Sequence, residues 1–214
     1  FTDYFDLAIS NIPFGDVAVF DPEFTGSQDP ARRSAPKAIH NYFFLKSLDA
    51  VREGGIVAFI TSQGVLDAPS NAPIREYMMR NANLVGVARL PNNLFTDNAG
   101  TEVGSDLINL QKNSGKKREL YDYEELFVQT EKTPIGSFQN GYVGSIGMIP
   151  HSDLISGTDP YGKPAYKVMH RDGIGQMAED LREHMDIELY KLDKKLYEMH
   201  SLHPAQGKST VTET

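Results

Sequence analysis

Residues 6–15, DLAISNIPFG, join a short apolar run to an abrupt turn. Three apolar residues in succession, without polar alternation, predict a buried strand. Pro13 then fixes its own φ and disfavours helix at the residue before it, and Gly15 accepts backbone angles that other residues avoid. We therefore expect a rigid turn at residues 11–15, at the carboxyl end of the strand, where open α/β sheets bind ligands.

The composition is that of a globular protein, with 214 residues of which 40% are hydrophobic and 23% are charged. The formal net charge of −8 gives no overall attraction to nucleic acid, so DNA binding would depend on local basic patches or on another part of the protein. The sequence has no cysteine, which excludes disulfides and thiol nucleophiles, and the histidines have no spacing typical of a metal site. We therefore assign no metal ligands.

Neither a membrane-spanning apolar run nor a secretory leader is visible, so we expect a cytoplasmic protein without a membrane partner. The sequence opens at Phe1 and enters a strand within a few residues. From this opening we expect a fragment of a longer protein.

Strand and helix patterns alternate along the first half of the sequence. Residues 16–36 are rich in Pro, Asp, Gly and Ser and predict a long loop. Beyond it, apolar spacing predicts helices at 37–52 and 72–82 and strands at 55–61, 84–91 and 105–113. This order predicts parallel units closed by an antiparallel hairpin of the last two strands.

The second half of the sequence has a different character. We place a domain boundary near residue 118, with a first domain at 1–118 and an extension at 119–214. Residues 127–171 contain many glycines and prolines and only short strand-like pieces. Apolar residues at intervals of three and four predict one long amphipathic helix at 174–199, followed by a polar tail.

The turn sequence SNIPFG resembles the catalytic motif of amino-group DNA methyltransferases, which is an Asp or Asn, two prolines and an aromatic after the fourth strand of a Rossmann-like sheet. The resemblance implies that the Asn11 side-chain oxygen and the Ile12 carbonyl accept the hydrogens of the target amine. It also implies that Pro13 aims this carbonyl inward and that Phe14 stacks on a base rotated out of the duplex. Ile12 stands where the family has Pro, which loosens the turn but keeps the acceptor carbonyl.

The order of elements over residues 4–112 resembles the adenine-specific branch of that family. The fold class implied is α/β, a partial Rossmann-like sheet of an S-adenosylmethionine-dependent methyltransferase (its last four strands), with a mixed carboxyl-terminal extension ending in a long helix. Phe95 matches an aromatic residue that contacts the target adenine in this branch, although a core aromatic explains it equally well. More loosely, residues 40–67 resemble the methylase portions of methylase–helicase fusions on bacterial mobile elements.

Methyltransferases of this fold bind S-adenosylmethionine through a Gly-rich turn and an acidic residue that precede the catalytic motif. The sequence contains neither, so the resemblance implies that residues 1–118 are the carboxyl half of a catalytic domain and names no cofactor-binding residue. DNA and the remainder of the parent protein are the partners implied. The family's first strand would pair with residues 6–10, so we expect that open edge to be covered by residues 119–171, by the long helix or by a second copy in a homodimer.

Two basic groups are candidates for contact with DNA phosphates, although solvated surface charge is the favoured alternative. They consist of Arg32 and Arg33, and of Lys116, Lys117 and Arg118.

The function that best fits these patterns is methyl transfer from S-adenosylmethionine to N6 of an extruded adenine in DNA. One alternative is methylation of a protein glutamine at N5, because a related motif serves that reaction. Another is a degenerate methyltransferase-like module that binds nucleic acid or protein without catalysis, which the unusual Ile12 and the acidic charge would favour.

Overall fold

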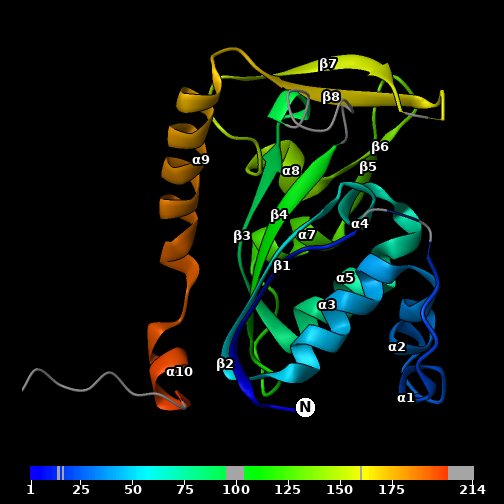
Figure 1. Ribbon diagram of the computed structural model, residues 1–214, viewed down its shortest axis with the longest axis vertical. Helices are drawn as coiled ribbons and strands as arrows, with labels where there is room; N and C mark the ends of the chain where they lie inside the picture. The colour runs from blue at the N-terminus through cyan, green and yellow to red at the C-terminus, as the bar shows by residue number, and fades with distance from the viewer. Residues whose placement is uncertain (14, 16, 95–103, 160, 202–214) are drawn as a thin grey trace, which may run out of the picture.

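The computed structural model describes residues 1–13, 15, 17–94, 104–159 and 161–201. Its centre is a four-stranded sheet in the order β1-β2-β4-β3 (Figure 1). β1 and β2 are parallel, and β4 is antiparallel to both of its neighbours, β2 and β3. The α/β class and the antiparallel pairing of the last two strands are confirmed. The strands are β1 (Phe5–Asn11), β2 (Val51–Ser62), β3 (Ala82–Leu90) and β4 (Ser105–Lys112).

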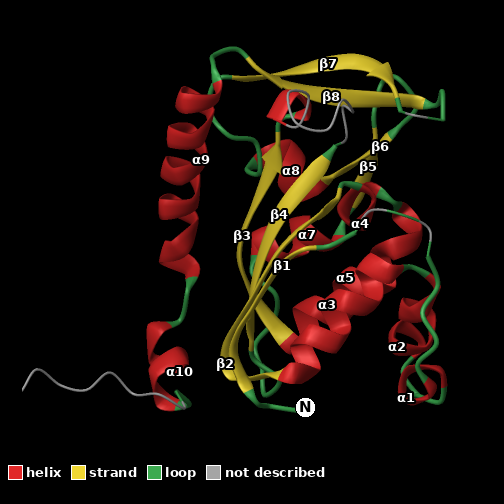
Figure 2. Ribbon diagram, in the orientation of Figure 1, coloured by secondary structure: helices red, strands yellow, loops and turns green. Residues whose placement is uncertain are grey.

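Helices cover both faces of this sheet (Figure 2). On one face, side chains of α3 (Ile39–Ala50), α5 (Ala72–Asn81) and α7 (Asp122–Val128) form the main hydrophobic core with the sheet. On the other face, Met177 of α9 (Ile174–Glu188) packs with Ala88 of β3 and with Ile149. Helices α3 and α5 confirm the two predicted helices of the first half.

The predicted long loop contains two short helices, α1 (Pro22–Thr25) and α2 (Pro30–Ser34). Each begins with an Asp-Pro pair, in which the Asp21 or Asp29 side chain accepts a hydrogen bond from the first-turn backbone. Asp is a favoured N-cap and Pro a favoured first residue of a helix, so these pairs start helices. A uniform loop over residues 16–36 is therefore a wrong prediction.

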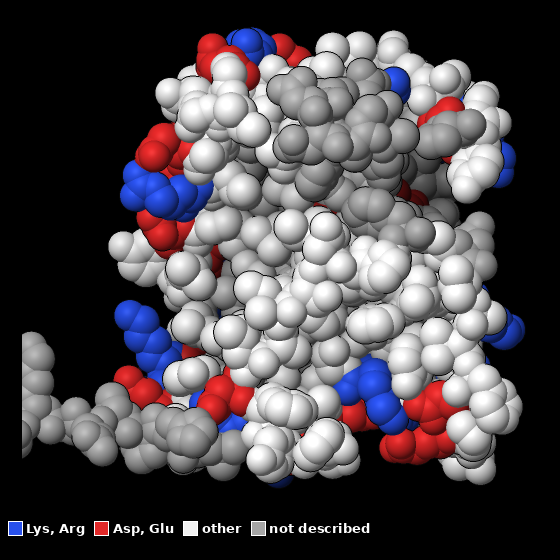
Figure 3. All heavy atoms as spheres, in the orientation of Figure 1, with Lys and Arg blue, Asp and Glu red and all other residues white. Residues whose placement is uncertain are grey.

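β1 is an edge strand rather than a buried one. Its side chains alternate between half-buried and exposed, with Leu7 51% and Ile9 75% exposed. Across the middle of the face seen in Figure 3, where β1 crosses in Figure 1, few charged side chains appear. Within the described residues, 119–171 form no strand or bridge with β1, and the helices after residue 174 pack against β2 and β3. The two predictions that residues 119–171 or the long helix cover the open edge of β1 are thus wrong for the described residues.

The second half of the chain packs onto the sheet. Phe127 of α7 and Tyr142 of α8 (Gly141–Ser145) lie in the main core, so the chain shares one core across residue 118. The domain boundary at that residue stays a prediction. The elements here are β5 (Thr130–Lys132), β6 (Phe138–Asn140), α8 (Gly141–Ser145), β7 (Ser152–Thr158) and β8 (Pro164–His170), and β5–β6 and β7–β8 form separate two-stranded sheets.

The predicted long helix is broken into α9 and α10 (Lys194–Met199). The Asp193 side chain caps α10 by accepting from the backbone of Leu196. The Gln111 side chain, on β4, bonds both the N–H and the carbonyl of Asp193, at 3.0 and 2.9 Å. These bonds satisfy backbone groups that a continuous helix would satisfy itself, so the break is stable.

The remaining short helical segments connect these elements. In the part of the chain that the structure describes, they are α4 (Gly64–Asp67) and four single 3-10 turns, η1 (Ala35–Lys37), η2 (Pro69–Asn71), η3 (Asn92–Leu94) and η4 (Leu189–Lys191). Among the described residues, none of the helices combines the length and the apolar character needed to cross a membrane.

Candidate active site

The motif lies where β1 leaves the sheet. Asn11 is the last residue of β1 and pairs with Ile60 of β2, so the two parallel strands end side by side. Ile12 is 1% exposed and its N–H donates to the Ile60 carbonyl at 2.9 Å. Pro has no N–H, so the family's usual residue could not make this bond. Ile12 therefore holds the turn by burial and a hydrogen bond, and the looser turn expected without Pro stays a prediction.

Two hydrogen-bond acceptors are available at this turn. The Asn11 side chain is exposed, and within the described part of the chain no donor contacts either its amide oxygen or the Ile12 carbonyl. Pro13 follows as an exposed residue, and Gly15 has a φ of +151°, which favours glycine. Phe14 and Phe95 lie outside the described residues. The turn thus places the exposed Asn11 directly before the buried Ile12 at the carboxyl edge of the sheet, and within the described residues neither acceptor has a donor.

A cleft opens at the same edge. It has a volume of about 530 Å³ and is lined by Gln63 and Asp67 near the end of β2, by Phe138 of β6 and by Tyr166 of β8. Gln63 lies three residues beyond Ile60, the partner of Asn11. The cleft and the motif therefore share the carboxyl edge of the sheet, which is the usual ligand edge of open α/β sheets.

A buried ion-pair network supports the cleft wall. Arg89 of β3 donates to Asp67 at 2.9 and 3.0 Å and to Asp106 of β4 at 2.6 and 3.1 Å. Burial opposes the charge of Arg89, but the two carboxylates outweigh it and raise its pKa above the ordinary value. The network joins α4 to β3 and β4. Sequence analysis missed it, although charged residues inside apolar strands are a signal for such pairs.

The first predicted basic group makes contacts within the protein. Arg32 donates to Asp49 at 2.8 and 2.9 Å, and its guanidinium lies 4.1 Å from the centre of the Phe24 ring. Arg33 donates to two backbone carbonyls of the preceding loop at 2.7 and 2.8 Å. These contacts stabilise the segment of α1 and α2.

The second basic group surrounds a buried carboxylate. Lys116 donates to Glu124 at 2.8 Å, and Arg118 donates to it at 2.6 and 2.9 Å. Burial alone would raise the pKa of Glu124, but the hydrogen bonds from Arg118 and Lys116 hold it below its usual value. Arg118 also stacks over Tyr121, whereas Lys117 is exposed.

Both basic groups lie at the edge of the sheet opposite the motif. Arg32 binds Asp49, just before β2 begins, whereas Asn11 pairs with Ile60 near the end of β2. Residues 116–118 follow β4, which runs antiparallel and so ends at this same far edge. At about 3.3 Å per residue, β2 separates them from the motif by roughly 25 Å. The structure does not join these basic residues and the motif into one surface, and their contact with DNA stays a prediction.

Comparison with known proteins decides the family. The model of the family described as N-6 DNA methylase matches residues 1–140, which include the whole four-stranded sheet and the motif turn. The chain belongs to the N-6 DNA methylase family. Its mixed sheet is the partial Rossmann-like sheet expected of S-adenosylmethionine-dependent methyltransferases, so the predicted fold class is confirmed.

Individual relatives of this N-6 DNA methylase family member are distant. Defense against restriction protein B of Escherichia phage P1 is 26% identical over 121 residues, 55% of this chain, and the chain spans only 5% of that protein's length. A type I restriction-modification methyltransferase subunit from Streptococcus thermophilus is 21% identical with a TM-score of 0.40, covering 57% of this chain and 30% of that one. The type I restriction enzyme EcoKI M protein is 12% identical with a TM-score of 0.42, covering 92% and 49%. The looser likeness to methylase–helicase fusions stays a prediction.

Proposed function

We propose that the protein containing this chain transfers a methyl group from S-adenosylmethionine to N6 of adenine in DNA. In this proposal residues 1–118 are the half of the catalytic domain that binds and polarises the extruded base, in a cytoplasmic enzyme. The observation that carries the proposal is the pair of neighbouring acceptors at Asn11 and Ile12, both without a donor in the described chain.

The chemistry of the reaction explains why this pair suits an exocyclic amine. The nitrogen lone pair of adenine N6 is conjugated with the ring, so the amine is a poor nucleophile. Acceptors fixed beside its two hydrogens stabilise the charge that develops as nitrogen becomes tetrahedral during methyl transfer. Asn11 would accept one hydrogen through its side chain, and Ile12 the other through its carbonyl. The bond from the Ile12 N–H to the Ile60 carbonyl fixes the peptide that precedes this carbonyl before the base arrives.

The edge of β1 supports a second part of the proposal, that the remainder of the parent protein supplies a neighbouring strand. β1 pairs on one side with β2 and, within the described residues, on no other side. A strand edge with exposed apolar side chains is a template for pairing with another chain segment. The added half would carry the S-adenosylmethionine site, and the 214-residue chain alone would be inactive. A second copy of the chain on this edge is the competing occupant.

Product analysis tests the proposed reaction and its alternatives. The full-length parent would be expressed in cells without adenine methylation, and nucleosides from their DNA and peptides from their proteins would be examined by mass spectrometry. We expect N6-methyladenine that is absent from cells without the gene. N5-methylglutamine with unmodified DNA would establish the protein-directed reaction instead. No methylated product from a folded, cofactor-loaded protein would establish a binding module.

A further inference from the structure

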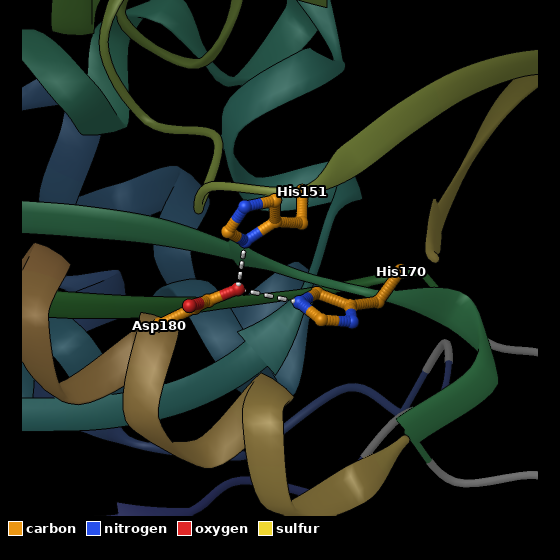
Figure 4. A group of neighbouring side chains, drawn as sticks. All are labelled: His151, His170 and Asp180. Atoms are coloured by element: carbon orange, nitrogen blue, oxygen red, sulfur yellow. Dashed lines mark hydrogen bonds and ion pairs between the residues drawn. The ribbon is translucent and has the colours of Figure 1, made fainter. Parts of the chain in front are cut away.

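Two histidines and an aspartate from separate segments meet beside α9 (Figure 4). His151 precedes β7, His170 ends β8, and Asp180 lies on α9. His151 Nδ1 is 2.7 Å and His170 Nε2 is 2.8 Å from the same oxygen, Oδ2 of Asp180. The three atoms all lie within 4.8 Å of one another. Two ring nitrogens therefore converge on one carboxylate oxygen, as ligands around a common centre do.

Further hydrogen bonds orient two of these side chains from the outside. The Asp172 N–H donates to His170 Nδ1 at 3.1 Å, and the Asp172 carbonyl lies 3.2 Å from the same atom, where it can accept a hydrogen from Nδ1 once Nε2 binds a cation. Gln176 donates to Asp180 Oδ1 at 2.7 Å, which leaves Oδ2 facing the histidines. Hydrogen bonds of this kind from the second layer fix ligand orientation and tautomer in metal sites.

The group is largely buried, and Asp180 is held by hydrogen bonds with His151, His170 and Gln176. The side chains of His170 and Asp180 are 0% and 3% exposed, whereas that of His151 is 51% exposed. A buried carboxylate is costly without an opposing charge, and within the described residues no Lys or Arg forms an ion pair with Asp180. Neutral imidazoles supply hydrogen bonds but no charge. The exposed side of His151 provides a route for an ion from solvent.

We propose that His151, His170 and Asp180 bind a divalent transition-metal ion, with zinc as the ion that fits best. Two imidazole nitrogens and one carboxylate oxygen suit zinc, whereas calcium and magnesium take sets of oxygen ligands. Three protein ligands leave the fourth tetrahedral position to water. Bonds of about 2.0–2.2 Å separate ligand atoms by roughly 3.4 Å, so Asp180 Oδ2 moves outward by roughly half an ångström as the ion enters.

The hydrogens on the rings must move when the metal enters. The carboxylate only accepts, so in the metal-free protein His151 Nδ1 and His170 Nε2 each carry a hydrogen. On binding, the hydrogen of His170 moves to Nδ1, which exchanges the hydrogen bond from the Asp172 N–H for one to the Asp172 carbonyl, and the hydrogen of His151 moves to Nε2. A histidine ring that is neutral before binding then releases no proton to solvent, whereas a ring that is protonated before binding releases one.

A bound ion would join the β7–β8 hairpin to α9. His151 and His170 lie at the base of this hairpin, and Lys163 and Tyr166 near its other end line the cleft beside the motif. Zinc would therefore hold the hairpin over the cleft. This inference does not depend on the reaction that the parent protein catalyses.

Zinc titration of the metal-stripped chain tests the site directly. We expect calorimetry to show one ion per chain, and cobalt in place of zinc to give the visible absorption of a tetrahedral site. His151→Asn and Asp180→Asn should each raise the dissociation constant at least ~10-fold. Asn suits position 151 because the φ of His151 is +55°. His200→Ala, which removes an exposed histidine outside the group, should bind as tightly as the unchanged protein.

Two results would overturn the proposal. One is the lack of saturable zinc binding by the folded protein, and the other is full affinity in folded His151→Asn, with folding checked by circular dichroism. Chymotrypsin cleavage after Tyr161, which is 83% exposed at the tip of the hairpin, gives an independent measure of the hairpin. Zinc should slow this cleavage in the unchanged protein and not in His151→Asn, and equal rates with and without zinc would refute the clamp. No DNA or S-adenosylmethionine is present in these assays, so they are independent of the proposed methyl transfer.

Discussion

Replacing Ile12 by Pro restores the residue that the family usually has and tests how this protein holds its catalytic turn. The Ile12 N–H donates to the Ile60 carbonyl at 2.9 Å, and the side chain is 1% exposed. The substitution removes this hydrogen bond, which stabilises the folded chain by about 1 kcal/mol. It also leaves the Ile60 carbonyl without a donor, which costs a further ~1 kcal/mol. The smaller ring also loses buried carbon, at roughly 1 kcal/mol.

Ile12→Val is the matched control because it shortens the side chain but keeps the N–H. We expect Ile12→Val to lower the free energy of unfolding by ~0.5–1.5 kcal/mol. Ile12→Pro should lower it by about 2–3 kcal/mol, since the rigidity that Pro gives the unfolded chain recovers up to ~1 kcal/mol. Urea unfolding followed by circular dichroism measures both. A Pro variant as stable as the Val variant would refute the claim that the hydrogen bond holds the turn.

Three further predictions concern the isolated chain. Arg89→Met should lower the free energy of unfolding by about 3–5 kcal/mol in urea titrations, because it leaves the Asp67 and Asp106 carboxylates unpaired. Arg33→Met should change it by less than ~1 kcal/mol. Equal effects of the two substitutions would show that the Arg89 ion pairs do not stabilise the fold. Folding lowers the pKa of Glu124 from 4.5, so its contribution to the free energy of unfolding is present above pH 4.5 and is lost as the pH falls through the folded value. Glu124→Gln should therefore flatten the decline in urea midpoint over that pH range. An unchanged pH profile would show that Glu124 does not cause the decline. Calorimetric titration with S-adenosylmethionine should show no saturable binding to the 214-residue chain, and micromolar binding at one site would place the cofactor site within it.

The regular elements of the sheet could be predicted because their signals are local. β2 and β3 are apolar runs between turn residues, and α5 has a Pro in its first turn. The extended form of β1 was also predictable, but its exposure was not. Burial of a strand depends on what lies beside it, and here β2 lies on one side only within the described residues.

The break in the predicted long helix involves a partner that is distant in the sequence. The apolar spacing of residues 174–199 fits one helix, but Gln111 bonds the backbone of Asp193 and stabilises the break between α9 and α10. Lys116 and Arg118 look like surface charge in the sequence, yet Glu124 binds both. Capping by Asp before Pro was a local signal in the predicted loop and could have been used.

The two candidate sites likewise differ in whether their residues are close in the sequence. The motif at Asn11 was recognisable because its residues are consecutive. The group of His151, His170 and Asp180 was not, because its spacings of 19 and 10 residues match no metal motif. A hairpin and a helix must first fold before these three side chains meet.

The central claim is that Asn11 acts on the target amine during methyl transfer, and a kinetic measurement on the intact parent protein tests it most directly. Transfer of labelled methyl groups from S-adenosylmethionine to DNA would be measured for the unchanged protein, for Asn11→Ala and for Asn113→Ala, a control at the opposite edge of the sheet. We expect Asn11→Ala to lower the turnover rate by about 10²–10³-fold with cofactor affinity unchanged, and Asn113→Ala to match the unchanged protein. Turnover by Asn11→Ala at the rate of the control would show that Asn11 does not act on the target amine.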